Sequence, residues 1–295
     1  MNIYVNGTVI NEEKAVVSVY DHGFLYGIGL FETFRTYGGI PFLLEAHMDR
    51  LASGCRQLGI AYEPSAEAWK RIVTELLSVN GLDDAYIRFT VTAGTDALGL
   101  PGGAYAEPSV IVYIKPLPAR SDKLYRDGKP LQLLRLARNT PEGEGRLKSL
   151  HYMNNLLAKR ELQQYAWAAA SAAEGLFVDA RGFLAEGIVS SLFFMKDGRL
   201  HTPALETGIL PGITRAFVMQ LGDQAGMRPT EGLYTWHDLL DADEVCLTNS
   251  IQEIVPVTSL FDSSGQETRV GGGSAGTLTA ALMLQYEQNT GSIGK

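Results

Sequence analysis

Glu186-Gly-Ile-Val-Ser-Ser-Leu-Phe-Phe194 follows Lys148 by 38 residues, and Gly208-Ile-Leu-Pro-Gly-Ile-Thr-Arg215 comes after it. The first stretch runs from a glycine into apolar residues, a pattern typical of a buried strand. The second ends in Gly-Ile-Thr, which is typical of a turn that opens a helix. The chain therefore presents an amine, a carboxylate at a strand end and a helix start, in that order.

These three groups match the chemical needs of one cofactor. A lysine amine can form a Schiff base with an aldehyde, and a carboxylate can hold a pyridine nitrogen in its protonated form. A Gly-rich turn that opens a helix can bind a phosphate. Pyridoxal 5'-phosphate (PLP) carries all three partners. Taken singly, each feature also has an ordinary interpretation: a surface lysine, a polar strand end and a capped helix.

The sequence around these groups resembles the fold-type IV PLP enzymes, which include branched-chain aminotransferases, D-amino acid aminotransferases and 4-amino-4-deoxychorismate lyases. The resemblance runs from Asp21-His-Gly-Phe-Leu-Tyr-Gly27 to Thr248-Asn-Ser-Ile-Gln-Glu-Ile-Val-Pro256, and the segment Asn139–Glu161 is most similar to the lyases. It implies a two-domain α+β architecture like that of D-amino acid aminotransferase, with PLP between the domains and a homodimer that completes the site. The implied parts are a smaller domain over residues 1–117, a linker over 118–122 and a larger PLP-binding domain over 123–290.

Composition excludes several other classes of protein. The net charge of −8 gives no basic footprint for nucleic acid, so an anionic substrate would need local arginines. The sequence has no basic leader followed by an apolar stretch and no apolar run of about 18 residues. The two cysteines form no C-x-x-C pattern. We therefore expect a reduced cytoplasmic enzyme without a metal site or a membrane span.

Periodicity predicts the main elements. Asn6-Gly7 predicts a hairpin over 2–10, and apolar residues spaced four, three, four and three apart predict a helix from Leu44 to Leu58. The G-x-G-x-x-G string over 271–276 is interpreted as a loop before the last helix, because no strand leads into it. Further helices are expected over 65–79, 150–173 and 214–226, and strands over 31–37, 41–44, 86–93, 109–115, 131–137, 176–180, 183–186 and 188–195.

The resemblance assigns residues to the cofactor. Lys148, at the expected start of a helix, would hold PLP and then move a proton at the substrate carbon. Glu186 would pair with the pyridine nitrogen, although Ser191 stands where the family has an asparagine. Arg50, three residues after His47, would grip the phosphate with its planar fork, unless this pair is only a solvated helix surface. The remaining cofactor-binding candidates are Tyr152, Ile213, Thr214, Asn249 and Ser250.

Tyr152 has two interpretations. It follows Lys148 by four residues, so a continuous helix would set both side chains on one face. Tyr152 would then reach the phenolic oxygen of the cofactor. Alternatively, it is half-buried where the helix packs.

The N-terminal half supplies the expected substrate side of the site. Tyr86 and Arg88 share a strand face by alternation and resemble residues that meet a substrate carboxylate, although a plain surface strand would look the same. Ile251 can offer a backbone N–H to such a group. The other residues assigned to the substrate side are Tyr26, Phe31, Glu32, Thr33 and Arg35.

The leading functional prediction is a 4-amino-4-deoxychorismate lyase, which yields 4-aminobenzoate and pyruvate for folate synthesis. Thr33 is its expected second catalytic residue, because branched-chain aminotransferases favour glycine there and a hydroxyl could act on the leaving group. The alternatives are an aminotransferase for branched-chain or D-amino acids, and a catalytically idle PLP-binding protein. The loop over 95–107 has no Lys or Arg, so Arg35, Arg88, Arg138 or Arg146 would have to neutralise the two carboxylates of the lyase substrate.

Overall fold

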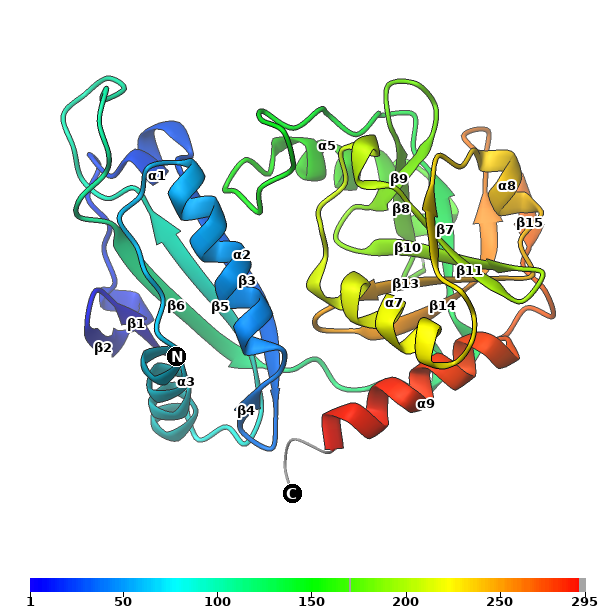
Figure 1. Ribbon diagram of the computed structural model, residues 1–295, viewed down its shortest axis with the longest axis horizontal. Coiled ribbons are helices and arrows are strands. Elements are labelled where there is room, and N and C mark those ends of the chain that lie inside the picture. Colours follow the sequence, from blue (N-terminus) through cyan, green and yellow to red (C-terminus); the bar gives the residue numbers. More distant parts are fainter. Residues whose placement is uncertain (170, 292–295) are drawn as a thin grey trace. The chain divides into compact units, whose positions relative to one another are not determined.

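The computed structural model describes residues 1–169 and 171–291 and divides into two compact units. Unit 1 comprises Met1–Pro118, Leu147–His151 and, among the described residues at the chain end, Thr290 and Gly291, and unit 2 comprises Ala119–Arg146 and Tyr152–Asn289. Both units combine helices with a sheet (Figure 1), which confirms the predicted α+β class. Leu147–His151 lies within the predicted larger domain but belongs to unit 1.

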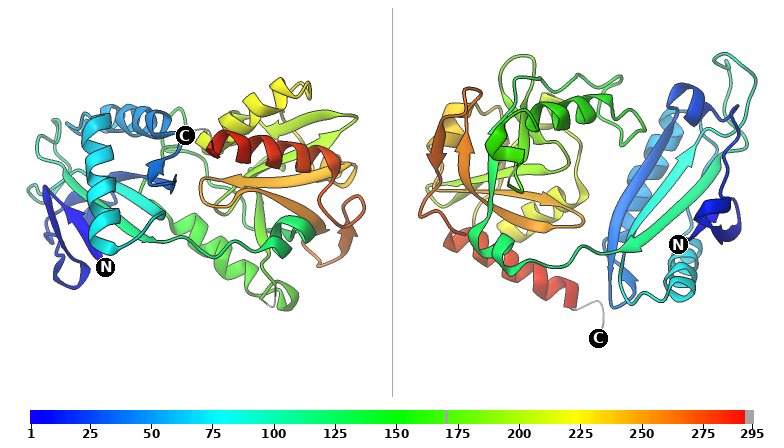
Figure 2. Two further views of the ribbon diagram at one scale, coloured as in Figure 1. Left: turned by 90° about the horizontal axis from the view of Figure 1, so that it is seen from below. Right: turned by 180° about the vertical axis from the view of Figure 1, so that it is seen from behind.

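Unit 1 contains an antiparallel sheet, six-stranded over the described residues, in the order β2-β1-β6-β5-β3-β4. Two helices, α2 (Leu44–Gln57) and α3 (Ala66–Asn80), cover one face of it (Figures 1 and 2). Asn6 and Gly7 both have positive φ, so the predicted Asn-Gly turn joins the first two strands. The strands are β1 (Asn2–Val5), β2 (Thr8–Asn11), β3 (Gly29–Tyr37), β4 (Ile40–Pro41), β5 (Ala85–Thr92) and β6 (Ser109–Pro116).

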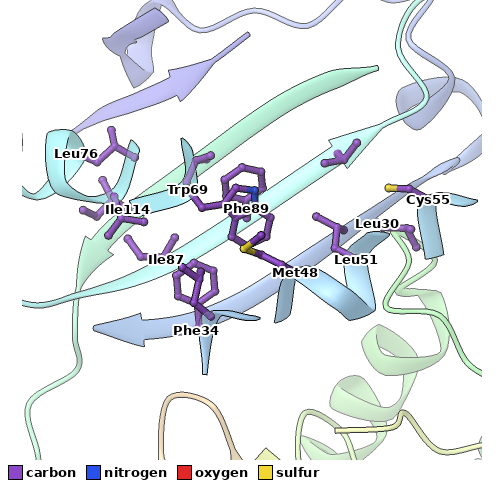
Figure 3. Close-up of a cluster of buried hydrophobic side chains, with 14 of the residues drawn as sticks. Leu30, Phe34, Met48, Leu51, Cys55, Trp69, Leu76, Ile87, Phe89 and Ile114 are labelled. Carbon is purple, nitrogen blue, oxygen red and sulfur yellow. The ribbon is translucent and has the colours of Figure 1, made fainter. Parts of the chain in front are cut away.

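The core of unit 1 lies between this sheet and its two helices (Figure 3). The apolar positions predicted for the face of α2, including Met48, Leu51 and Cys55, are buried there. Trp69 of α3 is fully buried and stacks on Phe89, with ring centres 3.7 Å apart. The aromatic stack joins α3 to the middle of the sheet.

We expect Trp69→Ala to destabilise the protein by about 3–5 kcal/mol, because it removes the largest buried side chain of this core. Urea unfolding followed by far-ultraviolet circular dichroism measures the change. Lys70→Ala is the matched control, since the Lys70 side chain is 54% exposed and its loss should change stability by about 0.5 kcal/mol or less. An equally small effect of Trp69→Ala would contradict this account of the core.

Unit 2 is built on a larger sheet in the order β12-β11-β10-β13-β14-β7-β8-β9, with β15 paired to β14. α5 (Met153–Leu162) packs on it through Ala158 and Leu162. α7 (Ile213–Gln224) meets α9 (Thr277–Gly291) through the rings of Phe217 and Tyr286. The strands are β7 (Lys129–Leu133), β8 (Glu174–Val178), β9 (Leu184–Gly187), β10 (Ser191–Lys196), β11 (Arg199–Pro203), β12 (Thr230–Gly232), β13 (Glu244–Asn249), β14 (Glu253–Phe261) and β15 (Glu267–Arg269).

Three sequence-based expectations differ from the structure. The helix expected over 150–173 is divided into α5 and the short α6 (Ala166–Ala169), and residue 170 lies outside the described residues. The expected linker ends in α4 (Asp122–Asp127), which Ser121 caps at its first turn. The Gly-rich string over 271–276 is a loop before α9, as predicted, but β15 ends just before it. Within the described ranges, no helix is long and apolar enough to cross a membrane.

Candidate active site

Strand β3 has two chemically different faces. Side chains alternate along a strand, and Leu30 and Phe34 point into the core beneath α2 (Figure 3). Phe31, Thr33 and Arg35 therefore lie on the opposite face. The structure thus groups three of the residues predicted for the substrate side.

The neighbouring strands add polar residues to that same face. Pairing of β5 with β3 sets Arg88 opposite Thr33 and Tyr86 opposite Arg35. Lys115 of β6 lies opposite Tyr86, with its Nζ 4.4 Å from the centre of that ring. The sequence analysis missed Lys115, although alternation along the strand over 109–115 could have found it. We call Phe31, Thr33, Arg35, Tyr86, Arg88 and Lys115 the open face of unit 1.

Lys148 lies beside this open face. The Phe31 N–H donates to the Lys148 carbonyl at 2.9 Å, and the Leu150 N–H donates to the Gly29 carbonyl at 3.0 Å. The Lys148 Nζ is 4.8 Å from the centre of the Phe31 ring, and the guanidinium carbon of Arg88 is 3.6 Å from that centre. Both cations therefore lie against the same buried ring.

The prediction that Lys148 begins a helix is wrong. Ser149 instead forms an isolated β-bridge with Leu30 at the start of β3, because the backbone groups of Lys148 and Leu150 bond to that strand, and α5 begins only at Met153. Tyr152 is the N-cap residue of α5, so it does not share a helical face with Lys148. The argument that placed Tyr152 one turn from the lysine therefore fails.

Glu32 lies on the core face of β3, away from the predicted substrate side. Its carboxylate accepts bonds from the Arg50 Nε at 2.7 Å and Nη2 at 2.6 Å. It also accepts a bond from the His47 Nδ1 at 2.7 Å. Because Glu32 occupies an even position of β3, with Leu30 and Phe34, alternation could have revealed its orientation.

Electrostatics hold Glu32 ionised in this position. Burial alone would raise the pKa of Glu32, but the Arg50 charge and the bonds from His47 and Arg50 lower it from 4.5 to about 2. Burial lowers the pKa of His47, while the bond to Glu32 and the charge of Glu32 raise it; in either case the Nδ1 donates to the carboxylate. The planar fork of Arg50 is consequently held in one orientation by its bidentate carboxylate partner.

In unit 2, Glu186 at the end of β9 is fixed by three groups. Its Oε1 accepts from the Arg138 Nε at 2.8 Å, and its Oε2 accepts from the Leu210 N–H at 3.0 Å. The Arg146 Nε is 3.9 Å from Oε1, and Arg146 also donates to the carbonyls of Asn139 and Gly208. Arg138 and Arg146 therefore direct their charges toward Glu186.

The start of α7 provides donors suited to a phosphate. Gly212 is its N-cap residue and supplies no side-chain cap, so the first N–H groups of the helix point outward. The hydroxyls of Thr214 and Ser250 lie 3.2 Å apart at this end. A Cβ added to Gly212 would come within 2.8 Å of the Ser191 Oγ, which explains the glycine.

Two other candidates serve the turn that carries Ser250. The Asn249 Oδ1 accepts from the N–H groups of Ile251 at 3.0 Å and Gln252 at 2.8 Å. The Asn249 side chain thus stabilises the turn, a role that the sequence analysis did not assign to it. The Ile251 N–H, which was expected to meet a substrate carboxylate, donates instead to the Asn249 side chain within the turn.

Tyr26, in unit 1, accepts a bond from the Gly99 N–H at 2.9 Å and so anchors the loop over 95–107.

The chemical groups present fit PLP. Unit 1 offers an amine at Lys148 and a guanidinium at Arg50, and unit 2 offers a carboxylate at Glu186 and the helix start with its two hydroxyls. The Ser190 Oγ, in the turn after Glu186, is buried and has no hydrogen-bond partner among the described residues. An orphaned buried hydroxyl is expected where a bound ligand supplies the missing partner.

The chain belongs to the class IV aminotransferase family, whose model matches residues 29–260. It is 41% identical to the aminodeoxychorismate lyase of Bacillus subtilis (strain 168) over 97% of this chain and 94% of the relative. It is 38% identical, over 87% of both chains, to a protein of Methanocaldococcus jannaschii described as a candidate branched-chain-amino-acid aminotransferase.

A solved structure gives the same family. A branched-chain amino acid aminotransferase from T.th., solved with pyridoxamine 5'-phosphate, matches with a TM-score of 0.84 and 29% identity, over 98% of this chain and 93% of that one. The predicted family is thereby confirmed, and the prediction of PLP as the cofactor agrees with that structure.

The pH dependence of the free energy of unfolding tests whether Arg50 and His47 stabilise the Glu32 carboxylate. A pKa lowered from 4.5 to about 2 corresponds to roughly 3 kcal/mol of stability at neutral pH. Because the folded pKa is the lower one, this contribution is present above pH 4.5 and is lost as the pH falls toward 2. We expect Glu32→Gln to reduce the free energy of unfolding at pH 7 and to differ progressively less from wild type below pH 4.5.

Urea unfolding across this pH range measures the difference. Glu75→Gln, at an exposed position of α3, is the control and should follow the wild type throughout. A Glu32→Gln deficit that stays constant down to pH 2 would show that the carboxylate is not stabilised by Arg50 and His47.

Proposed function

We propose that this chain is a PLP-dependent 4-amino-4-deoxychorismate lyase, which forms 4-aminobenzoate and pyruvate in folate biosynthesis. The observation that carries the proposal is the open face of unit 1, which carries three cations and Thr33. Arg88 lies opposite Thr33, Arg35 follows Thr33 by two residues, and Lys115 lies opposite Tyr86. The Lys148 Nζ lies over the ring of Phe31 on the same face. The substrate of this reaction has two carboxylates and one amine, so it suits a surface with several cations next to a reactive amine. Identity to the B. subtilis lyase supports the same assignment.

The structure favours two of the four arginines considered for these carboxylates. Arg138 and Arg146 interact with Glu186 and with backbone carbonyls. Arg35 and Arg88 instead share the face that carries Thr33, and their guanidinium groups lie over aromatic rings. We assign Arg35 and Arg88 to the substrate carboxylates.

Lys148 is proposed as the catalytic base. Bound PLP would supply an aldehyde that captures the substrate amine and a pyridine ring that draws electrons from the neighbouring carbon. Lys148, released beside that carbon, would take its proton. Glu186 would hold the ring nitrogen protonated, and its bonds from Arg138 and Leu210 would keep the carboxylate oriented.

Each unit has its own candidate donors for the phosphate. The candidate in unit 1 is Arg50, oriented by Glu32. The candidates in unit 2 are the N-terminus of α7 and the hydroxyls of Thr214 and Ser250. Tyr152 remains a proposed contact to the phenolic oxygen of the cofactor, and it is 39% exposed at the start of α5.

Thr33 is the proposed second catalytic residue. Departure of the enolpyruvyl group as pyruvate requires a proton at that group, while the ring left behind becomes aromatic. Thr33 lies opposite Arg88 and two residues before Arg35 on the open face, where its hydroxyl can position or relay this proton.

The competing proposal is an aminotransferase for branched-chain or D-amino acids. The similarity to the M. jannaschii protein favours it, and Lys148, Glu186 and the phosphate donors would serve both reactions. A transaminase needs no proton on a leaving group, so Thr33 and the surplus of cations on the open face distinguish the two proposals.

We also propose a cytoplasmic homodimer. Exposed apolar side chains gather where residues 15–21, α1 (His22–Tyr26) and the loop over 95–107 meet through backbone bonds. Apolar groups concentrated on one surface favour association. These side chains are Val16, Val17, Val19, Tyr20, Phe24, Leu98 and Leu100.

Borohydride reduction tests the assignment of Lys148. We expect reduction of the yellow holoenzyme to fix the cofactor on the peptide that contains Lys148, and Lys148→Ala to abolish this labelling. Lys159→Ala, at an exposed position of α5, is the control and should label as the wild type does. Mass-spectrometric mapping of the adduct to another lysine would overturn the assignment.

Product analysis tests the proposed reaction. Supplied with aminodeoxychorismate, the wild type should form 4-aminobenzoate and pyruvate faster than it transaminates any common L- or D-amino acid. Thr33→Gly should lower the rate by about 10²-fold or less, since a positioned proton donor contributes on that scale, and should leave the cofactor spectrum unchanged. Rapid transamination of leucine or D-alanine without 4-aminobenzoate would establish the aminotransferase instead.

A further inference from the structure

A buried pair of opposite charges in unit 2 has no role in the chemistry described above. Lys129 opens β7 and Glu174 opens β8, and the two residues are only 5% and 8% exposed. The Lys129 Nζ lies 3.7 Å from the Glu174 Oε2. Burial lowers the pKa of Lys129 and raises that of Glu174, because each charge has lost water. Since a buried ion pair adds little net stability, its presence calls for another explanation.

Lys129 is linked to the turn that carries Ser250. Its Nζ donates to the Gln252 Oε1 at 3.1 Å. The Gln252 N–H in turn donates to the Asn249 Oδ1 at 2.8 Å. The lysine therefore fixes the far end of the four-residue turn whose second residue, Ser250, faces Thr214 across 3.2 Å.

Glu174 is linked to a second turn, the one that follows Glu186. Its Oε1 accepts from the Val189 N–H at 3.4 Å. The same turn is closed by the Gly187 N–H, which donates to the Ser190 carbonyl at 2.8 Å. A Cβ on Gly187 would come within 3.2 Å of the Glu174 Cγ, so the turn packs against the Glu174 side chain.

We propose that Lys129 and Glu174 are positioning residues that hold these two turns in register, so that Ser250 and the residues around Glu186 meet one ligand. The ligand class is a phosphorylated pyridine, so the inference rests on the proposed roles of Ser250 and Glu186 in cofactor binding. Neither residue of the pair touches the reacting atoms. The buried pair connects the turn that carries Ser250, proposed to bind the phosphate, with the turn after Glu186, proposed to bind the ring nitrogen. Lys129 reaches the first turn through Gln252, and Glu174 reaches the second through Val189.

Pyridoxine 5'-phosphate is the probe, because it has the ring and the phosphate but no aldehyde to react with Lys148. Its affinity for the apoprotein is measured by equilibrium dialysis. We expect Lys129→Met to weaken binding about tenfold, the scale of one lost charge-assisted hydrogen bond. Lys123→Met, at an exposed position of α4 in the same unit, is the matched control and should bind as the wild type does.

A double variant separates positioning from stability. Lys129→Met alone leaves Glu174 buried without its cation, which destabilises the fold. Lys129→Met with Glu174→Gln removes both charges and should return the unfolding midpoint toward wild type, yet binding should stay about tenfold weak because the bond to Gln252 is still absent. Recovery of affinity together with stability would overturn the proposal.

A double-mutant cycle with Ser250→Ala shows which route the effect takes. If Lys129 acts through the Ser250 turn, Lys129→Met should cost less than about threefold in the Ser250→Ala background, since coupled positions are not additive. A full tenfold loss in both backgrounds would contradict that route and overturn the proposal. If the wild-type apoprotein fails to bind pyridoxine 5'-phosphate, the assignment of the cofactor residues fails instead, which is a distinct outcome.

Discussion

The strict alternation of side chains along β3 is the constraint on which the rest of unit 1 depends. Its even positions bury Leu30 and Phe34 and place Glu32 against Arg50 and His47. Its odd positions form the open face. Because a shift of one residue would exchange the two faces, the same pairing with β5 that builds the core also sets the spacing of the proposed catalytic groups.

Much of this arrangement could be predicted from the sequence. Periodicity predicts α2, α3 and the N-terminal hairpin, and alternation alone groups Tyr86 with Arg88. The order of a lysine, a glutamate and a Gly-Ile-Thr helix start identified the family that the comparisons then confirmed. These predictions are correct because each depends on a local pattern, formed by neighbouring residues within about one helical turn or one strand.

The conformation around Lys148 and the partners of Glu186 could not be predicted, because they depend on residues distant in the sequence. The sequence predicts a helix over 150–173 with Lys148 at its start. Ser149 instead pairs with Leu30, because the edge of β3, more than a hundred residues earlier, offers backbone groups to residues 148–150. Likewise, nothing near Arg138 or Arg146 in the sequence indicates that both interact with Glu186. Tertiary pairing of this kind overrides local propensity, and periodicity alone contains no information about it.

The return of Leu147–His151 to unit 1 has a consequence for how the chain acquires its structure. A ribosome-bound or recombinant fragment that ends at Pro118 has every strand of the first sheet but lacks the segment that covers the start of β3. Its exposed edge would present unsatisfied N–H and carbonyl groups, a template for pairing with another chain. Unit 1 is therefore complete only after residues 119–146 of unit 2 have been synthesised, so cutting the chain at Pro118 does not yield the whole of unit 1.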